Sequence, residues 1–148
     1  MSRHHIIAAL LVVLTVVVFL RVHDHEFVWD DRIDIYENPH LTSDTGPEIL
    51  VFWQKPYQHL YIPLTYTVWA TIARFSKVPT TAEGISLNPR PFHAANLFVH
   101  LLSILVVFTI LRLLVRSDWA AGVGTMLFAL RPVQVESVVW VEIGRAHV

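Results

Sequence analysis

The 148-residue chain contains no cysteine, so it has neither a disulfide framework nor a thiolate zinc site. Charged residues are also few, at 16%, and the formal net charge at pH 7 is -1. Because no cluster of Lys and Arg occurs, we expect no nucleic-acid partner. The phosphate-binding loop G-x-x-x-x-G-K-S/T, the nucleophile elbow G-x-S-x-G and the zinc motif H-E-x-x-H are absent. These absences argue against the enzyme classes that such motifs define.

Apolar residues are abundant instead, at 54%, and they occur in runs. The run Phe92 to Val115 would be about 36 Å long as a helix, enough to cross a hydrocarbon core of about 30 Å. It predicts a transmembrane helix over 92–116. The run Ile6 to Leu20 is shorter, and RVHDHEF follows it where a cleavable signal would have small residues. We therefore predict an uncleaved signal-anchor helix over 1–22.

A third apolar run begins at Trp119 and is interrupted by Arg131 and Pro132. It predicts a membrane segment over 118–141 that is kinked or ended at Pro132. The short link before it carries Arg112 and Arg116, which the positive-inside rule places in the cytoplasm. The expected fold is an all-α polytopic membrane protein with about three membrane segments and a long external loop over 23–91.

The external loop contains the segment LTYTVWATIARF, residues 64–75, which is too short to span a bilayer at about 20 Å. One helical face would carry Leu64, Val68, Ile72 and Phe75. The aromatic residues suit the headgroup level of a membrane: Tyr61, Tyr66 and Trp69. This pattern predicts a short interfacial helix that lies along the bilayer.

The stretch FVWDDR places the adjacent carboxylates Asp30 and Asp31 just beyond the first apolar run. One carboxylate of such a pair could act as a base while the other holds an acceptor or a metal ion. The alternative is a solvated acidic loop, since Asp24, Glu26, Asp34 and Glu37 lie close by in the sequence. Composition alone favours this alternative.

Three polar residues share one face of the second apolar run: His93, Asn96 and His100. Polar groups on a membrane helix usually face a bundle interior, so interhelical hydrogen bonding is favoured over metal ligation. The run HDHE, residues 23–26, offers only weak evidence for a cation site. No cofactor is predicted, and the sequence leaves open whether the protein binds a divalent cation.

The order of motifs resembles a known family. After the signal anchor come FVWDD, ENPHL, YIPLTY, PFHAANLFVHLL and LRPVQVESVVWV. This order is similar to the N-terminal part of the transmembrane-and-tetratricopeptide glycosyltransferases, which belong with the protein O-mannosyltransferases in the GT-C superfamily. The resemblance covers residues 6–141.

The resemblance implies a membrane enzyme that moves a sugar from a polyprenyl-phosphate carrier to a protein or glycan hydroxyl on the non-cytoplasmic face. It places Asp30 and Asp31 in the active site, and we expect Arg131, Glu136 and His93 to bind substrate. Transfer from a phosphate carrier needs a base but no strong acid, because phosphate is already a good leaving group. The chain departs from the family pattern at Ile62, where arginine is common, and at Arg131 and Gln134, where histidines are common.

The alternative function is a non-enzymatic, multi-span membrane module for assembly or transport. The ending EIGRAHV, residues 142–148, matches the translation of a common sequencing adapter, so we expect an artefact there and an N-terminal fragment of a longer protein. The expected location is an integral, multi-pass position in a membrane, with the bacterial inner membrane favoured over the endoplasmic reticulum of a eukaryote.

Overall fold

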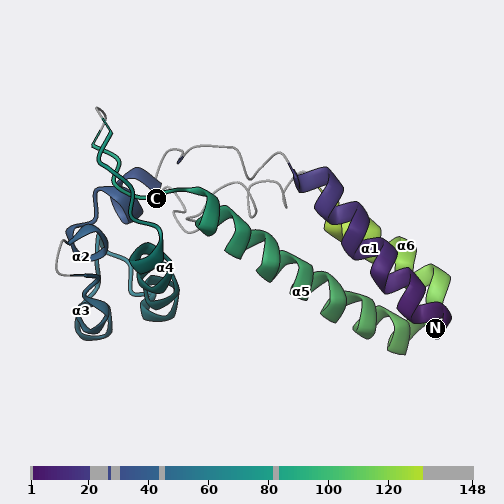
Figure 1. Cartoon of the computed structure of the whole chain (residues 1–148). Helices are drawn as coiled ribbons and strands as arrows, with labels where there is room; N and C mark the ends of the chain where they lie inside the picture. Colours follow the sequence, from purple (N-terminus) through teal and green to yellow (C-terminus); the bar gives the residue numbers. More distant parts are fainter. Residues whose placement is uncertain (1, 21–26, 28–30, 44–45, 82–83, 132–148) are drawn as a thin grey trace. The chain divides into compact units, whose positions relative to one another are not determined.

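The computed structural model describes residues 2–20, 27, 31–43, 46–81 and 84–131 (Figure 1). The described residues form helices joined by turns, with two isolated β-bridges and no strand. They fall into two compact units. The apolar unit draws on Met1–His25 and His93–Ile143, and the loop unit draws on Glu26–Phe92.

The apolar unit contains α1 (Arg3–Phe19), most of α5 (Arg90–Val115) and α6 (Asp118–Ala129). The contact face of α1 repeats every four residues: Ile7, Leu11, Thr15 and Phe19 are buried. Small residues dominate the facing side of α6, where Ala121, Gly122, Thr125 and Ala129 are buried. A Cβ atom on Gly122 would lie 2.9 Å from Cγ2 of Ile7. Small side chains therefore let the two helices approach closely, as Figure 1 shows.

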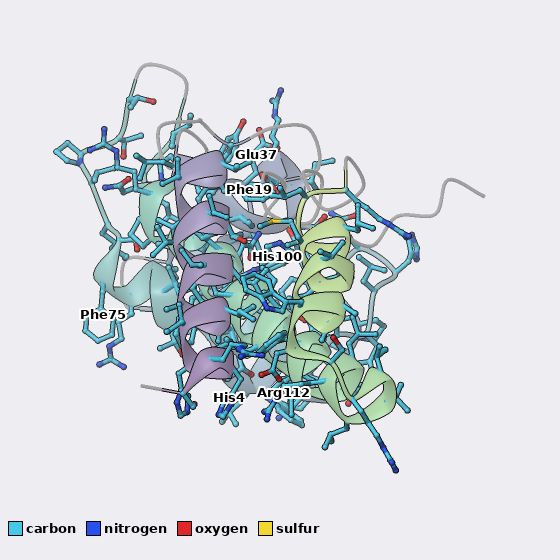
Figure 2. The ribbon with its side chains drawn as sticks, turned by 90° about the vertical axis from the view of Figure 1, so that its right-hand side faces the viewer. His4, Phe19, Glu37, Phe75, His100 and Arg112 are labelled. Atoms are coloured by element: carbon cyan, nitrogen blue, oxygen red, sulfur yellow. The ribbon has the colours of Figure 1, made fainter. Side chains whose placement is uncertain are left out.

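The three helices of the apolar unit alternate in direction. At one end, Arg112 near the end of α5 donates a hydrogen bond to Asp118 at the start of α6, with 2.6 Å between Nε and Oδ1. At the other end, Phe19 of α1 packs edge-on against His100 in α5. Figure 2 shows His4 and Arg112 at one end of the unit and Phe19 and His100 toward the other. Helices α1 and α6 therefore run in one direction and α5 in the opposite one.

The outer surface of the apolar unit is also apolar. Exposed side chains include Val13 and Val17 of α1, Val106 and Leu113 of α5, and Val123 of α6. Helix α5, with 26 residues, is long and apolar enough to cross a membrane. At 17 residues α1 is shorter than a typical span, and α6 has 12. Within the described part of the chain, one of the three predicted membrane segments, α5, is therefore long enough to cross a membrane by itself. The predicted continuation of the third segment beyond Arg131 lies outside the described residues.

The described part of the loop unit contains four short elements: η2 (Arg32–Tyr36), α2 (Pro39–Thr42), α3 (Ile49–Gln54) and α4 (Pro63–Phe75). Asn38 caps α2, because its side chain accepts a hydrogen bond from the backbone of His40, and Pro39 follows at the first helical position. In the core of the unit, the ring of Phe52 stacks on that of Tyr66 with centroids 4.4 Å apart. The chain then returns to α5 through a narrow turn with a bridge between Lys77 and Leu87.

The aromatic residues of α4 lie differently from the sequence-based expectation. Tyr66 and Trp69, which were expected at the headgroup level, are buried in the core of the loop unit. Their rings contact each other edge to face, with centroids 5.3 Å apart. The apolar stripe points outward, since Leu64, Val68 and Phe75 are exposed. The aromatic residues pack inside because other elements of the unit supply matching aromatic surface.

Candidate functional site: a buried acidic turn

Asp31 lies at the start of the five-residue π-helical turn η2, where it is the N-cap residue. Its side chain is 1% exposed. Single π-helical turns are rare and often occur at functional sites. The neighbouring carboxylate of the predicted pair, Asp30, lies outside the described residues.

Asp34, three residues further along the same turn, is a second buried carboxylate. The phenol of Tyr66 donates a hydrogen bond to Oδ1 of Asp34 at 3.1 Å. The backbone carbonyl of Asp34 accepts a further hydrogen bond from the side chain of Asn38 at 3.0 Å. Assigning Asp34 to a solvated acidic loop was therefore wrong. The spacing of three residues between Asp31 and Asp34 was the only signal in the sequence that could have suggested a shared turn.

Aromatic side chains support the turn from one side. Tyr57 and Trp69 both contact the ring of Tyr66 edge to face. The hydroxyl of Tyr57 donates to the carbonyl of Ile33 at 3.3 Å. Burial raises the pKa of the Tyr57 hydroxyl, so this group keeps its proton and remains a donor. The turn that carries Asp31 is therefore attached at two points, the Ile33 carbonyl and the Asp34 carboxylate.

Other carboxylates of the loop unit have surface partners. Glu37 pairs with Arg32 at 2.6 Å, and Glu48 pairs with His40 at 2.8 Å. Both glutamates are substantially exposed, so these ion pairs contribute little to stability. Among the described residues of the loop unit, the carboxylates are thus of two kinds, buried ones on the π-helical turn and exposed ones outside it.

Two of the remaining predicted site residues, His93 and Arg131, belong to the apolar unit. His93 is buried near the start of α5. Arg131 is exposed and follows the end of α6 by two residues, while Glu136 lies outside the described range. The structure therefore assigns Asp31 to one unit and both His93 and Arg131 to the other.

His100, two helical turns after His93, joins two helices. Its Nε2 lies 3.2 Å from the carbonyl oxygen of Ala129, the last residue of α6. A carbonyl at a helix end has no partner within the helix, so this contact satisfies a group that would otherwise be buried without one. The prediction of interhelical hydrogen bonding on this face is confirmed for His100. Within the described ranges, no group of three or more His, Asp or Glu side chains could hold a metal ion.

The chain resembles a fly O-mannosyl-transferase. It is 29% identical over 139 residues to Protein O-mannosyl-transferase Tmtc2 of Drosophila melanogaster. The match covers 90% of this chain but only 14% of the length of that protein. No family model matches the chain. No solved structure matches it either. The similarity supports a relationship with the transmembrane-and-tetratricopeptide family.

Proposed function

We propose that this chain is part of a membrane glycosyltransferase of the GT-C type, which moves a sugar from a polyprenyl-phosphate carrier to a hydroxyl of a protein or glycan. The observation that carries the proposal is the similarity to an O-mannosyl-transferase over nine-tenths of the chain. An apolar helix long enough to span a bilayer, α5, supports the membrane setting. The buried acidic turn, in the loop between α1 and α5, supplies carboxylate chemistry.

In the proposed reaction, the acceptor hydroxyl attacks the anomeric carbon of the sugar. The bond from that carbon to the carrier phosphate breaks, and the phosphate leaves with the bonding electrons. The hydroxyl proton goes to a carboxylate of the pair Asp30 and Asp31, which acts as the general base. Arg131, with His93 and Glu136, binds the substrates, and its guanidinium offers paired donors suited to a phosphate.

The proposed topology follows from the directions of the helices. The end of the apolar unit that holds Arg3, Arg112 and Arg116 faces the cytoplasm. The loop unit, between α1 and α5 in the sequence, then faces the opposite side. In this arrangement α1 and the segment that begins with α6 also cross the membrane, which gives about three membrane segments.

The test uses the full-length protein and a transfer assay with a polyprenyl-phosphate sugar donor. Asp30→Asn and Asp31→Asn keep the size of the side chain but remove the basic oxygen. Turnover should fall by roughly 10² to 10⁴ for whichever residue is the base. Asp24→Asn and Glu37→Gln are matched controls, and Glu37 is exposed in the structure. Asp34→Asn is not a suitable control, because Asp34 is buried and bonded to Tyr66.

The outcomes separate the proposal from its alternative. Loss of turnover in one of the two variants, with normal membrane insertion and active controls, supports a catalytic carboxylate. Equal turnover in all four variants would overturn the assignment of Asp30 and Asp31. Absence of transfer in the unsubstituted full-length protein with every polyprenyl-phosphate sugar tried would favour the non-enzymatic membrane module.

A further inference from the structure

A polar cavity lies in the loop unit, beside the narrow turn that leads from α4 to α5. Its volume is about 310 Å³, and its lining includes Tyr36, Thr42, Lys77, Thr80 and Ser86. Tyr36 is the last residue of η2 and Thr42 the last of α2, while the other three belong to the turn. Ligand pockets in proteins typically measure about 300–1,000 Å³. The cavity therefore has room for a small molecule or for one unit of a larger one.

Hydrogen bonds fix the two sides of the cavity. In the turn, the backbone of Val78 donates to the carbonyl of Ser86 at 2.9 Å. Figure 1 shows the turn as two lengths of chain that run side by side. On the opposite side, the ammonium of Lys77 donates to the carbonyl of Ser43, just after α2, at 2.6 Å. The turn is therefore attached to the segment that carries the rest of the lining.

Hydroxyl groups are the main polar side-chain groups of the lining. Within the described part of the chain, no hydrogen bond involves the hydroxyl of Tyr36, Thr80 or Ser86. A hydroxyl can donate one hydrogen bond and accept two. The ligand that matches these groups best is one whose own polar groups both donate and accept, as in a molecule rich in hydroxyls.

The charge of the lining argues against an anionic ligand. The ammonium of Lys77 is the one charged group among the lining side chains of the described residues, and it already bonds to a carbonyl. Proteins usually bind phosphate with arginine or with the start of a helix, and neither lines this cavity. An anion also offers acceptors only, so it would leave the acceptor capacity of the hydroxyls unused. A neutral ligand is therefore favoured over phosphate.

An aromatic ring and an interrupted backbone edge favour a sugar over a peptide. A peptide commonly adds a strand to the edge of a turn of this kind, using its backbone donors. Pro79, between two lining positions of the turn, has no backbone N–H and interrupts that row of donors. The ring of Tyr36 lies against that of Phe27, with centroids 5.5 Å apart. Such a fixed ring is a flat apolar surface on which the C–H face of a sugar ring can pack.

We propose that this cavity binds a carbohydrate, with one sugar ring packed on Tyr36 and hydrogen-bonded to the hydroxyls of Thr80 and Ser86. Tyr36 ends the π-helical turn that Asp31 caps, so the bound glycan contacts the same element as the proposed base. The carbohydrate site does not depend on the proposed transferase activity, because binding is measured without turnover. Its failure would therefore leave the proposed function standing.

The test measures the binding of simple sugars to the chain in an amine-oxide detergent, which has neither a sugar nor a phosphate headgroup. The probes are the methyl glycosides of glucose, galactose and mannose, and saturation-transfer NMR gives their dissociation constants. Thr80→Val and Ser86→Ala each remove one hydroxyl from the lining, and neither side chain belongs to the buried core. Thr65→Val is the matched control, because Thr65 is exposed in α4 and does not line the cavity.

At least one glycoside should receive saturation at its C–H protons. Its dissociation constant should rise roughly 3- to 10-fold in Thr80→Val and in Ser86→Ala, and stay unchanged in Thr65→Val. Absence of transfer to all three glycosides would overturn the proposal. Equal affinity in the three variants would also overturn it, because the sugar would then bind elsewhere. Inorganic phosphate and a tetraserine peptide are measured in parallel, and binding of either one in place of the glycosides would show an anion or peptide site instead.

Discussion

At the scale of single residues, the hydrogen bond between Tyr66 and Asp34 determines how the acidic turn is held. The two residues are 32 positions apart in the sequence, yet both are buried and the phenol meets the carboxylate at 3.1 Å. The ring of Tyr66 is itself fixed by stacking on Phe52. A charged acceptor in a buried position gains more from such a donor than an exposed one does. This bond therefore connects α4 to the turn that begins at Asp31.

Tyr66→Phe tests the importance of this bond. The substitution keeps the ring and its stacking but removes one donor from the Asp34 carboxylate, so the free energy of unfolding should fall by about 1.5–3 kcal/mol. The change is measured by thermal or denaturant unfolding in detergent, with the protease sensitivity of the loop unit as the readout. Tyr61→Phe is the control, because its hydroxyl bonds to a backbone carbonyl at an exposed position. Equal stability of the two variants would contradict the role given to Tyr66.

At the scale of elements, the contact between α1 and α6 depends on glycine and alanine. Side chains on α1 recur every four residues and meet the small face of α6. A Cβ atom on Gly122 would collide with Ile7. A Cβ atom on Gly124 would lie 3.0 Å from Cδ1 of Leu111, which is also a tight contact. Within a membrane, where lipid is as apolar as the side chains, close packing of this kind is what holds helices together.

Gly122→Leu should separate α1 from α6. The added side chain meets Ile7, and overpacking of this kind typically lowers stability by about 1–3 kcal/mol. Thermal unfolding in detergent measures the loss. Val123→Leu adds bulk to the exposed side of the same helix and should change little. Ile7→Ala combined with Gly122→Leu should recover part of the stability. If Gly122→Leu and Val123→Leu behaved alike, the close contact would not be the interface that the structure shows.

At the scale of the whole molecule, the chain combines an apolar unit, whose described surface is largely apolar, with a loop unit that has its own aromatic core. Arg112 and Arg116 lie at one end of the apolar unit, where Arg112 pairs with Asp118, and Arg131 follows the other end of α6. The chain leaves this unit after α1 and re-enters it through α5. By the positive-inside rule, the proposed topology places the end that holds Arg3, Arg112 and Arg116 in the cytoplasm and the loop between α1 and α5 on the other side of the membrane.

Cysteines introduced singly at Ser43 and Ser117 test this topology. Ser43 lies in the loop unit, and Ser117 is the exposed N-cap of α6 beside the basic end. In intact cells or right-side-out vesicles, an impermeant thiol reagent should label position 43 and spare position 117 until the membrane is opened. The absence of native cysteine removes background labelling. Labelling of 117 alone would show the reverse orientation.

The sequence by itself determined the features that depend on neighbouring residues. The long apolar run predicted a helix over 92–116, and α5 runs from Arg90 to Val115, because continuous apolar composition and helix length are local properties. The polar residues on one face of that run predicted a packed face, and His100 fulfils this by bonding to Ala129. Proline and asparagine in ENPHL likewise mark the start of α2.

The tertiary structure alone decided which side of each short helix is buried. The pattern of α4 contains an apolar stripe and an aromatic stripe, and either could face a core. Phe52 and Tyr57, from other segments, supply the partners that draw Tyr66 and Trp69 inward and leave Leu64, Val68 and Phe75 outside. Asp34 is buried for the same reason, because the donor that makes burial of its carboxylate tolerable comes from α4. Such choices depend on contacts between segments far apart in the chain, and no local pattern of residues contains them.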